Sequence, residues 1–116
     1  MASYRGEPEE SDFERVARLD EVPPGQVIRV EVDGRGLALV NLDGIFYAID
    51  NNCQHNGGPL AQGRLDTRRG ELICPWHAWC WDVRSGRAMD PPVNFRALTY
   101  EVRLEGEDVL VSRSPR

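Results

Sequence analysis

Short stretches of alternating and apolar residues, separated by glycine turns, predict a protein made of β-strands. Residues 26–32, QVIRVEV, alternate between hydrophobic and polar and run into an Asp-Gly pair at 33–34. Residues 37–42, LALVNL, run into a second Asp-Gly pair before IFYAID. Asp-Gly between two strand-like stretches is a strong signal for a two-residue hairpin turn. The first half of the chain therefore predicts a meander of antiparallel strands.

The last part of the chain predicts a further hairpin. Between residues 98 and 105, Leu98, Tyr100, Val102 and Leu104 occupy alternate positions, and Gly106 then turns the chain back into DVLVS. No stretch shows the 3.6-residue period of an amphipathic helix. We therefore expect an all-β protein of small antiparallel sheets.

Composition divides the chain into a tail and one domain. Residues 1–12 are polar and acidic, which predicts a flexible N-terminal tail, and we assign residues 13–113 to the folded domain. From about residue 50 to residue 95 the strand signals weaken, and Gly, Pro and Trp become frequent. A meander that supports such a loop-rich insert is typical of a scaffold that carries a functional site.

Charge, hydrophobicity and cysteine content argue against a nucleic-acid partner, a membrane partner and a disulfide framework. The net charge is −5, and because the tail supplies much of it, the domain is only mildly acidic, which argues against a nucleic-acid partner. No apolar run approaches the roughly 20 residues that cross a bilayer, and the first residues do not resemble a signal peptide. We therefore expect a cytoplasmic protein without a membrane partner. Three cysteines, an odd number, fit poorly with a disulfide framework.

The two histidines of the chain each follow closely behind a cysteine. The first box is Cys53-x-His55 and the second is Cys74-x-x-His77, with 18 residues between the boxes. Chance placement and a Cys53–Cys74 disulfide both leave the histidines unexplained. A structural zinc site is a real alternative, but zinc modules usually pair like ligands within a box. Mixed boxes suit two sulfide-bridged irons, because each loop tip can give a cysteine to one iron and a histidine to the other.

The double box, with the flanks HNGGPL and CPWHAW…DVRSG and the later PP, resembles the Rieske iron–sulfur motif over about residues 13–112. The resemblance implies the Rieske fold and one [2Fe–2S] cluster, with Cys53 and Cys74 on the inner iron. It places His55 and His77 on the outer iron, near the surface. Since protein ligands would fill every iron position, we expect an electron-transfer protein without catalytic residues.

Residues near the boxes have expected roles around the cluster. The backbone amides of Gly57 and Gly58 are expected to approach the sulfides, although both glycines could simply turn the chain. The other expected members of this surrounding shell are Trp76 as a shield and Pro59, Pro91 and Pro92 as rigid covers that limit water. Farther along, one of Trp79 and Trp81 is expected in the core, and Cys80 is interpreted as a small buried hydrophobe.

The resemblance also distinguishes subgroups of the family. Rieske subunits of cytochrome bc complexes carry a membrane anchor and two additional cysteines that form a disulfide, and the matching positions here are Gly58 and Trp76. Oxygenase subunits have a large catalytic domain, for which this chain has no room. The resemblance therefore implies a monomeric Rieske ferredoxin that carries single electrons from a flavoprotein reductase to a terminal ring-hydroxylating oxygenase. The small subunit of assimilatory NAD(P)H nitrite reductase and a structural zinc-binding module remain alternatives.

The sequence around the second box predicts a low reduction potential. The cytochrome bc relatives have a serine and a tyrosine whose hydroxyl groups donate hydrogen bonds to the sulfurs of the cluster. The matching positions here are Trp79 and Trp81, and neither can supply an O–H group. We therefore expect a potential at the low end of the Rieske range.

Overall fold

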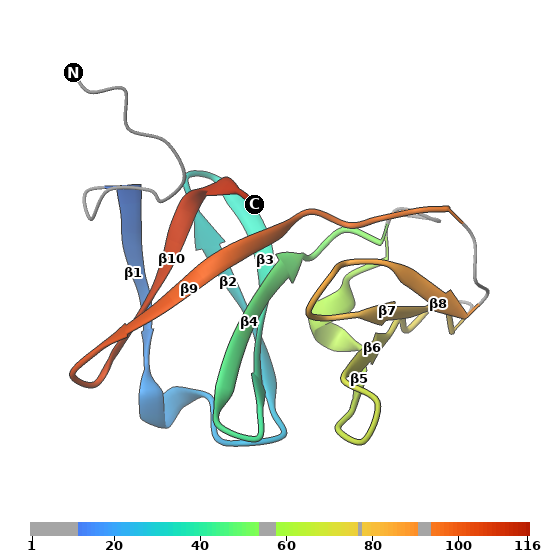
Figure 1. Ribbon diagram of the computed structural model, residues 1–116, viewed down its shortest axis with the longest axis horizontal. Helices are drawn as coiled ribbons and strands as arrows, with labels where there is room; N and C mark the ends of the chain where they lie inside the picture. The colour runs from blue at the N-terminus through green and yellow to red at the C-terminus, as the bar shows by residue number, and fades with distance from the viewer. Residues whose placement is uncertain (1–11, 54–57, 77, 91–93) are drawn as a thin grey trace.

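Two antiparallel sheets lie side by side in the computed structural model, which describes residues 12–53, 58–76, 78–90 and 94–116 (Figure 1). The larger sheet has strand order β1-β10-β9-β4-β3-β2, and the smaller sheet has strand order β5-β6-β7-β8. The strands of the larger sheet are β1 (Phe13–Arg18), β2 (Val27–Val32), β3 (Arg35–Leu42), β4 (Ile45–Asp50), β9 (Thr99–Glu105) and β10 (Asp108–Pro115). Those of the smaller sheet are β5 (Arg64–Asp66), β6 (Glu71–Ile73), β7 (Cys80–Asp82) and β8 (Ala88–Asp90). Among the described residues, helical structure is limited to Asp12 and two 3₁₀ turns, η2 (Leu19–Glu21) and η3 (Leu60–Gln62), so the all-β prediction is confirmed.

Both hairpins predicted from Asp-Gly pairs are present, and their turns have the expected geometry. Asp33 and Gly34 have φ of 52° and 81°, and Asp43 and Gly44 have φ of 56° and 92°. Positive φ at both central positions defines a type I′ turn, whose twist matches that of the strands it joins. The two turns therefore set the β2-β3-β4 meander, which is paired in register along its length.

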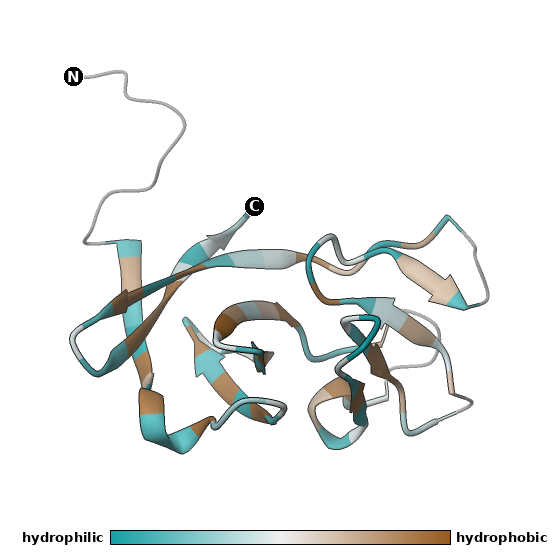
Figure 2. Cartoon of the chain, turned by 60° about the horizontal axis from the view of Figure 1, so that its bottom comes forward, coloured by the Kyte–Doolittle hydropathy of each residue, from teal (hydrophilic) through white to brown (hydrophobic). Residues whose placement is uncertain are grey.

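β3 is buried on both faces because two cores share its alternate residues. Leu37 and Leu39 belong to a core enclosed by the larger sheet, whose edge strands β1 and β2 contact each other. Ala38 and Val40 belong to a second core, which also contains Trp81 of the smaller sheet. Strands buried on both faces have continuous apolar runs, whereas strands with one solvated face show the alternation visible in Figure 2. The run LALV at residues 37–40 is thus explained by the second sheet.

Backbone hydrogen bonds tie the smaller sheet to the segment that leads into β9. The Ala97 amide donates to the Gly86 carbonyl at 2.7 Å, and the Ala88 amide donates to the Phe95 carbonyl at 3.0 Å. The segment before β9 therefore runs along the hairpin between β7 and β8. This arrangement fixes one end of the smaller sheet against the larger one.

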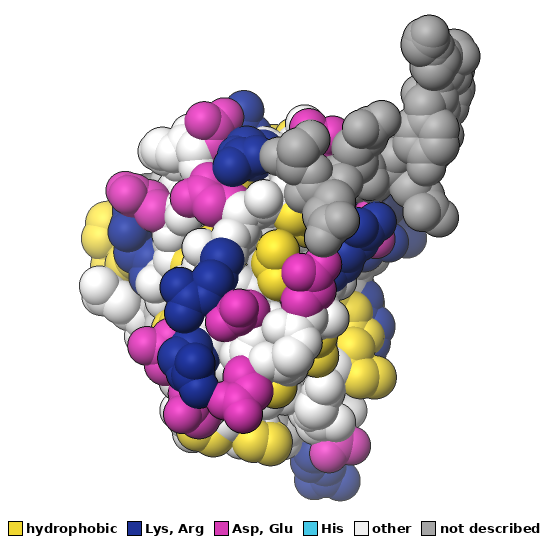
Figure 3. All heavy atoms as spheres, turned by 90° about the vertical axis from the view of Figure 1, so that its left-hand side faces the viewer, with side chains coloured by type: hydrophobic (Ala, Val, Ile, Leu, Met, Phe, Trp, Pro, Cys, Tyr) yellow, Lys and Arg dark blue, Asp and Glu magenta, His cyan; other side chains and the backbone are white. Residues whose placement is uncertain are grey.

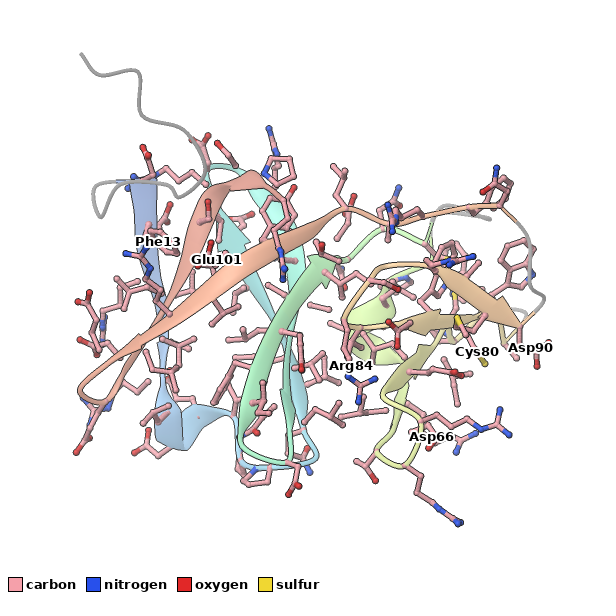
Figure 4. All side chains as sticks on the ribbon, viewed as in Figure 1. Phe13, Asp66, Cys80, Arg84, Asp90 and Glu101 are labelled. Atoms are coloured by element: carbon pink, nitrogen blue, oxygen red, sulfur yellow. The ribbon has the colours of Figure 1, made fainter. Side chains whose placement is uncertain are left out.

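A side-chain contact also bridges the two sheets. Arg84, in the turn between β7 and β8, lies between the sheets in Figure 4, with its guanidinium carbon 6.0 Å from the centre of the Tyr47 ring of β4. At exposed sites such a cation–π contact contributes about 0.5–1 kcal/mol. Cys80 and Asp90 lie at the opposite end of the smaller sheet, away from the larger one (Figure 4).

The side of the molecule farthest from the smaller sheet has charges of both signs (Figure 3). Arg15 pairs with Asp108 at 2.8 Å, and Arg18 pairs with Glu107. Exposed pairs of this kind contribute little to stability, and they leave no patch of a single sign on this side.

Among the described residues, no helix has the length and apolar character needed to cross a bilayer. The predicted tail lies outside the described residues except for its last position.

Gly86→Ala is expected to weaken the attachment of the smaller sheet. Gly86 has φ of 81°, and a Cβ atom there would lie 2.1 Å from the carbonyl oxygen of Ala97. The left-handed conformation costs about 1–2 kcal/mol for a residue with a Cβ, and forcing packed groups apart adds about 1–3 kcal/mol. Gly34→Ala is the matched control, because Gly34 has the same φ and no atom within 4 Å of its Cβ position. Chemical denaturation should show a larger loss of unfolding free energy for Gly86→Ala, and equal losses would contradict the predicted overlap.

Candidate metal centre

The cysteines of the two boxes lie together in the core shared by the two sheets. Cys53 follows β4 and Cys74 follows β6, and their side chains are 0% and 2% exposed. Both belong to the core that contains Trp81. The two thiols interact directly, and neither forms a disulfide. The fold therefore brings two cysteine sulfurs from distant parts of the sequence to one buried position.

Each cysteine closes a short loop by the same type of hydrogen bond. The Cys53 amide donates to the Gly58 carbonyl at 2.9 Å, and the Cys74 amide donates to the Trp79 carbonyl at 2.7 Å. In each case the partner lies five residues later, so each loop includes the histidine of its box. The first loop is also held at its base by Asn51, whose side-chain oxygen accepts the Ala61 amide at 2.7 Å. In both boxes, the backbone of the cysteine is thus held by a hydrogen bond to the residue five positions later.

The environment of Cys74 favours a neutral thiol in the chain without metal. Burial raises the pKa of the Cys74 thiol to about 11, although the Trp76 amide, 3.4 Å from its Sγ, lowers it in part. The adjacent Cys53 thiol raises the pKa further. Two adjacent thiolates here would require cations to balance their charge, which a bound metal provides while removing the thiol protons. The pair is therefore suited to a soft metal centre.

The second box has a strained backbone and an exposed tryptophan. Ala78 has φ of 59°, a left-handed conformation that residues with a Cβ seldom adopt and that often marks functional sites. Trp76 is 50% exposed, so its ring does not serve as core packing. Its predicted role as a shield over the cluster remains a prediction.

A row of three aromatic rings leads from the surface into the core beside the second box. Phe95, which is 44% exposed, stacks on Trp79 with ring centres 5.6 Å apart, and Trp79 lies 6.0 Å from Trp81. Trp81 is fully buried, which confirms that one of the two tryptophans is a core residue. Sequence reasoning missed Phe95, because this residue stands alone after the Pro-Pro stretch, outside any strand pattern.

The fully buried Trp81 has an unpaired donor. Its indole Nε1 has no hydrogen-bond partner within the part of the chain that the structure describes. Leaving a buried donor unpaired costs about 1–3 kcal/mol. A polar atom of this kind, in the same core as the thiols of Cys53 and Cys74, is expected where an additional acceptor binds.

Cys80 is not the buried residue that the sequence predicted. Because side chains alternate along β7, Trp81 points into the core while Cys80 points to the opposite face and is half-buried. Its Sγ lies 3.7 Å from the Ala78 carbonyl oxygen. Burial raises the pKa of this thiol, and the charge of Glu71 adds to the increase. Cys80 is therefore separated from the thiol pair by the sheet itself.

Several predicted site residues lie outside the described residues, namely His55, Gly57, His77, Pro91 and Pro92. Within the described residues, no group of three or more His, Cys, Asp or Glu side chains is placed to hold a metal ion. Gly58 is buried, with its carbonyl bound to Cys53, and Pro59 is half-buried and precedes η3. Of the four predicted ligands, the structure thus describes the positions of the two cysteines, Cys53 and Cys74.

Comparison with known proteins agrees with this geometry. The Rieske [2Fe-2S] domain family matches residues 12–101. The ferredoxin component of a naphthalene 1,2-dioxygenase system from Pseudomonas aeruginosa is 41% identical, over 83% of this chain and 90% of the relative. The solved ferredoxin of carbazole 1,9a-dioxygenase from Nocardioides aromaticivorans IC177 is 32% identical and has a TM-score of 0.84, covering 88% of this chain and 98% of that one. A structure described as a complex of reduced oxygenase and oxidized ferredoxin in carbazole 1,9a-dioxygenase matches at 25% identity with a TM-score of 0.83, over 90% of this chain and 96% of that one. This chain therefore belongs to the Rieske [2Fe-2S] domain family.

Proposed function

We propose that this protein is a Rieske ferredoxin that carries single electrons from a flavoprotein reductase to the terminal oxygenase of a ring-hydroxylating dioxygenase system. The observation that carries the proposal is that the chain matches nearly the full length of ferredoxin components, 90% of one by sequence and 98% of another by structure. One related ferredoxin has been solved together with its oxygenase. Membership of the Rieske family implies a [2Fe–2S] cluster, and we place this ferredoxin in the cytoplasm.

The donor set fits this cofactor. We assign Cys53 and Cys74 to one iron and His55 and His77 to the other. The assignment is supported by the buried thiol pair and by the two loops of equal span, each of which includes one histidine. The unpaired indole N–H of Trp81 in the same core supplies a donor for a sulfur atom.

The ligand types suit a one-electron carrier. Two thiolates balance the charge of about +2 of an oxidised [2Fe–2S] core and neutral histidines add none, so the bound centre would alternate between a neutral and a singly negative state. The chain itself contributes a core of apolar residues that keeps water from the sulfurs. Four protein ligands leave no open iron position, so the site is expected to carry electrons without binding a substrate.

Exposed apolar side chains near the second box provide a surface for docking. Trp76, Met89 and Phe95 are 50%, 44% and 44% exposed, and they lie in the second box, in β8 and against Trp79 respectively. Transient electron-transfer complexes bury small surfaces, often below about 1,200 Å². We propose that the oxygenase and the reductase contact this end of the protein in turn.

Single-turnover electron transfer tests the proposed function. The protein is reduced with dithionite, freed of excess reductant and mixed without oxygen with the oxidised oxygenase of the naphthalene 1,2-dioxygenase system. We expect about one electron per chain to pass, seen as reoxidation of the ferredoxin spectrum. A protein that fails with naphthalene, biphenyl and carbazole oxygenases but reduces a nitrite reductase large subunit would instead be the nitrite reductase small subunit.

Substitution of the boxes tests the ligand assignment. His55→Cys or His77→Cys is expected to lower the potential by on the order of 100 mV, because each adds negative charge to the centre. Cys53→Ser or Cys74→Ser is expected to abolish iron binding and to lower stability, since metal binding and loop folding are coupled. Cys80→Ser is the matched control and should keep full iron and sulfide content. A bleached Cys80→Ser protein, or a colourless wild-type protein that contains zinc, would overturn the assignment.

The reduction potential is expected to lie near the low end of the Rieske range, roughly −150 mV. Trp79 and Trp81 replace the hydroxyl donors of the high-potential relatives, and Gly58 and Trp76 stand where those relatives have a disulfide. A low potential suits a carrier fed by a flavin, because each 59 mV changes a one-electron equilibrium tenfold. Voltammetry of the purified protein measures it, and a midpoint above about +100 mV would contradict the assignment.

A further inference from the structure

The indole N–H of Trp81 is the one buried side-chain donor that the described structure leaves without a partner. Trp81 lies in β7 and is 0% exposed, and within the described part of the chain no other buried side-chain nitrogen or oxygen is unpaired. Native cores pair nearly all such atoms, so an exception calls for an explanation such as a missing ion or cofactor. The question is which acceptor this N–H meets.

The backbone places Trp81 on the same face as the Cys74 thiol. Trp81 pairs with Leu72 of β6, and Cys74, two residues after Leu72, continues on the same face of the sheet. The bond from the Cys74 amide to the Trp79 carbonyl extends the pairing beyond β6, so Cys74 and Trp81 are diagonal neighbours. Diagonal neighbours have Cβ atoms about 7–8 Å apart, within reach of an aromatic side chain.

Among the buried hydrophobic residues of this core, only the two cysteines carry a side-chain acceptor, and the buried Asn41 of β3 already accepts the Gly44 amide. Apart from Trp81 and the two cysteines, those members are alanine, valine, leucine and isoleucine. Tyr47 packs against the core but is only partly buried, and its ring contacts Arg84. A neutral thiol is a weak acceptor, whereas sulfur with negative charge accepts stronger, charge-assisted bonds. The N–H is therefore expected to gain its acceptor when the thiols bind metal.

We propose that Trp81 is a positioning and tuning residue, which donates its indole N–H to a sulfur atom of the bound [2Fe–2S] centre and thereby raises the reduction potential. The proposal rests on the proposed cluster site, but it does not depend on which reductase or oxygenase is the partner. A hydrogen bond to sulfur stabilises the more negative, reduced state. One electron enters the centre on reduction, and the proton stays on the indole.

The effect of Trp81 is consistent with the low reduction potential that the sequence predicts. Trp81 stands at the position where high-potential relatives have a tyrosine hydroxyl, and an indole N–H is a single donor without an acceptor atom. A typical protein hydrogen bond changes an equilibrium by a few-fold to about tenfold. The indole is thus expected to keep the potential above the value that the same fold would have with an apolar ring at residue 81.

The first test compares the potentials of two variants with their cluster loaded. Trp81→Phe removes the N–H and keeps an aromatic ring, and it is expected to lower the one-electron reduction equilibrium constant three- to tenfold, where tenfold equals 59 mV. Trp79→Phe is the matched control, because Trp79 is a half-buried neighbour with its ring centre 6.0 Å from that of Trp81. Its potential should stay within twofold of the wild-type equilibrium. An unchanged potential in Trp81→Phe, with full iron and sulfide content, would overturn the proposal.

A second test detects the bond itself and does not depend on how well phenylalanine packs. Wild-type protein labelled with ¹⁵N only in its indole rings, and reduced, should show a ¹⁵N hyperfine coupling to the paramagnetic centre in pulsed EPR. This coupling should disappear in Trp81→Phe and persist in Trp79→Phe. If Trp81→Phe does not retain iron, replacing Trp81 with benzothienylalanine keeps the ring shape and removes only the N–H. Absence of the coupling in wild type, or an unaltered potential in the benzothienyl protein, would reject the proposal even if electron transfer to an oxygenase is observed.

Discussion

The burial of two adjacent thiols is the constraint around which the functional end of this protein is organised. Cys53 and Cys74 are almost fully buried in an apolar core, and burial there raises the pKa of Cys74 to about 11. Burial therefore favours the neutral thiol of Cys74 in the chain without metal, and a bound metal would remove its proton. Each cysteine is anchored through its backbone, because its amide is bonded to a carbonyl five residues later. The fold therefore holds the two sulfur atoms at one buried position in the shared core.

The two sheets contribute to different cores of the protein. The larger sheet encloses its own core, whereas the smaller sheet shares its core with one face of β3 and with both thiols. The smaller sheet has strands of only three residues, and sheets of this size need packing against another element for stability. Contacts from Gly86 to Ala97 and from Arg84 to Tyr47 supply part of that support. The end that contains the thiol pair thus depends on the meander for its rigidity.

Hydrogen-bond donors around the sulfurs link the fold to the redox property. The Trp76 amide approaches the Sγ of Cys74 at 3.4 Å, and the Trp81 indole has a free donor in the same core. Both donors come from the second box and the strand that follows it. Of the two, only Trp81 is fully buried, so the proposed tuning of the potential would come from a residue that is neither a metal ligand nor part of the proposed docking surface. This separation would let the docking end evolve with its partners while the core sets the driving force.

The hairpin strands and the family were encoded locally and could be predicted from the sequence. Asp-Gly pairs at 33–34 and 43–44 set type I′ turns by their own conformational preferences, and the mixed Cys/His boxes identified the family through residue types and spacing. Other features depend on contacts between distant segments. The outward direction of Cys80 follows from the register of β7 with β6, and the stacking of Phe95 on Trp79 follows from the path of the chain before β9. The unpaired N–H of Trp81 became visible only with tertiary structure, because a donor is unsatisfied only with respect to the neighbours that packing brings to it.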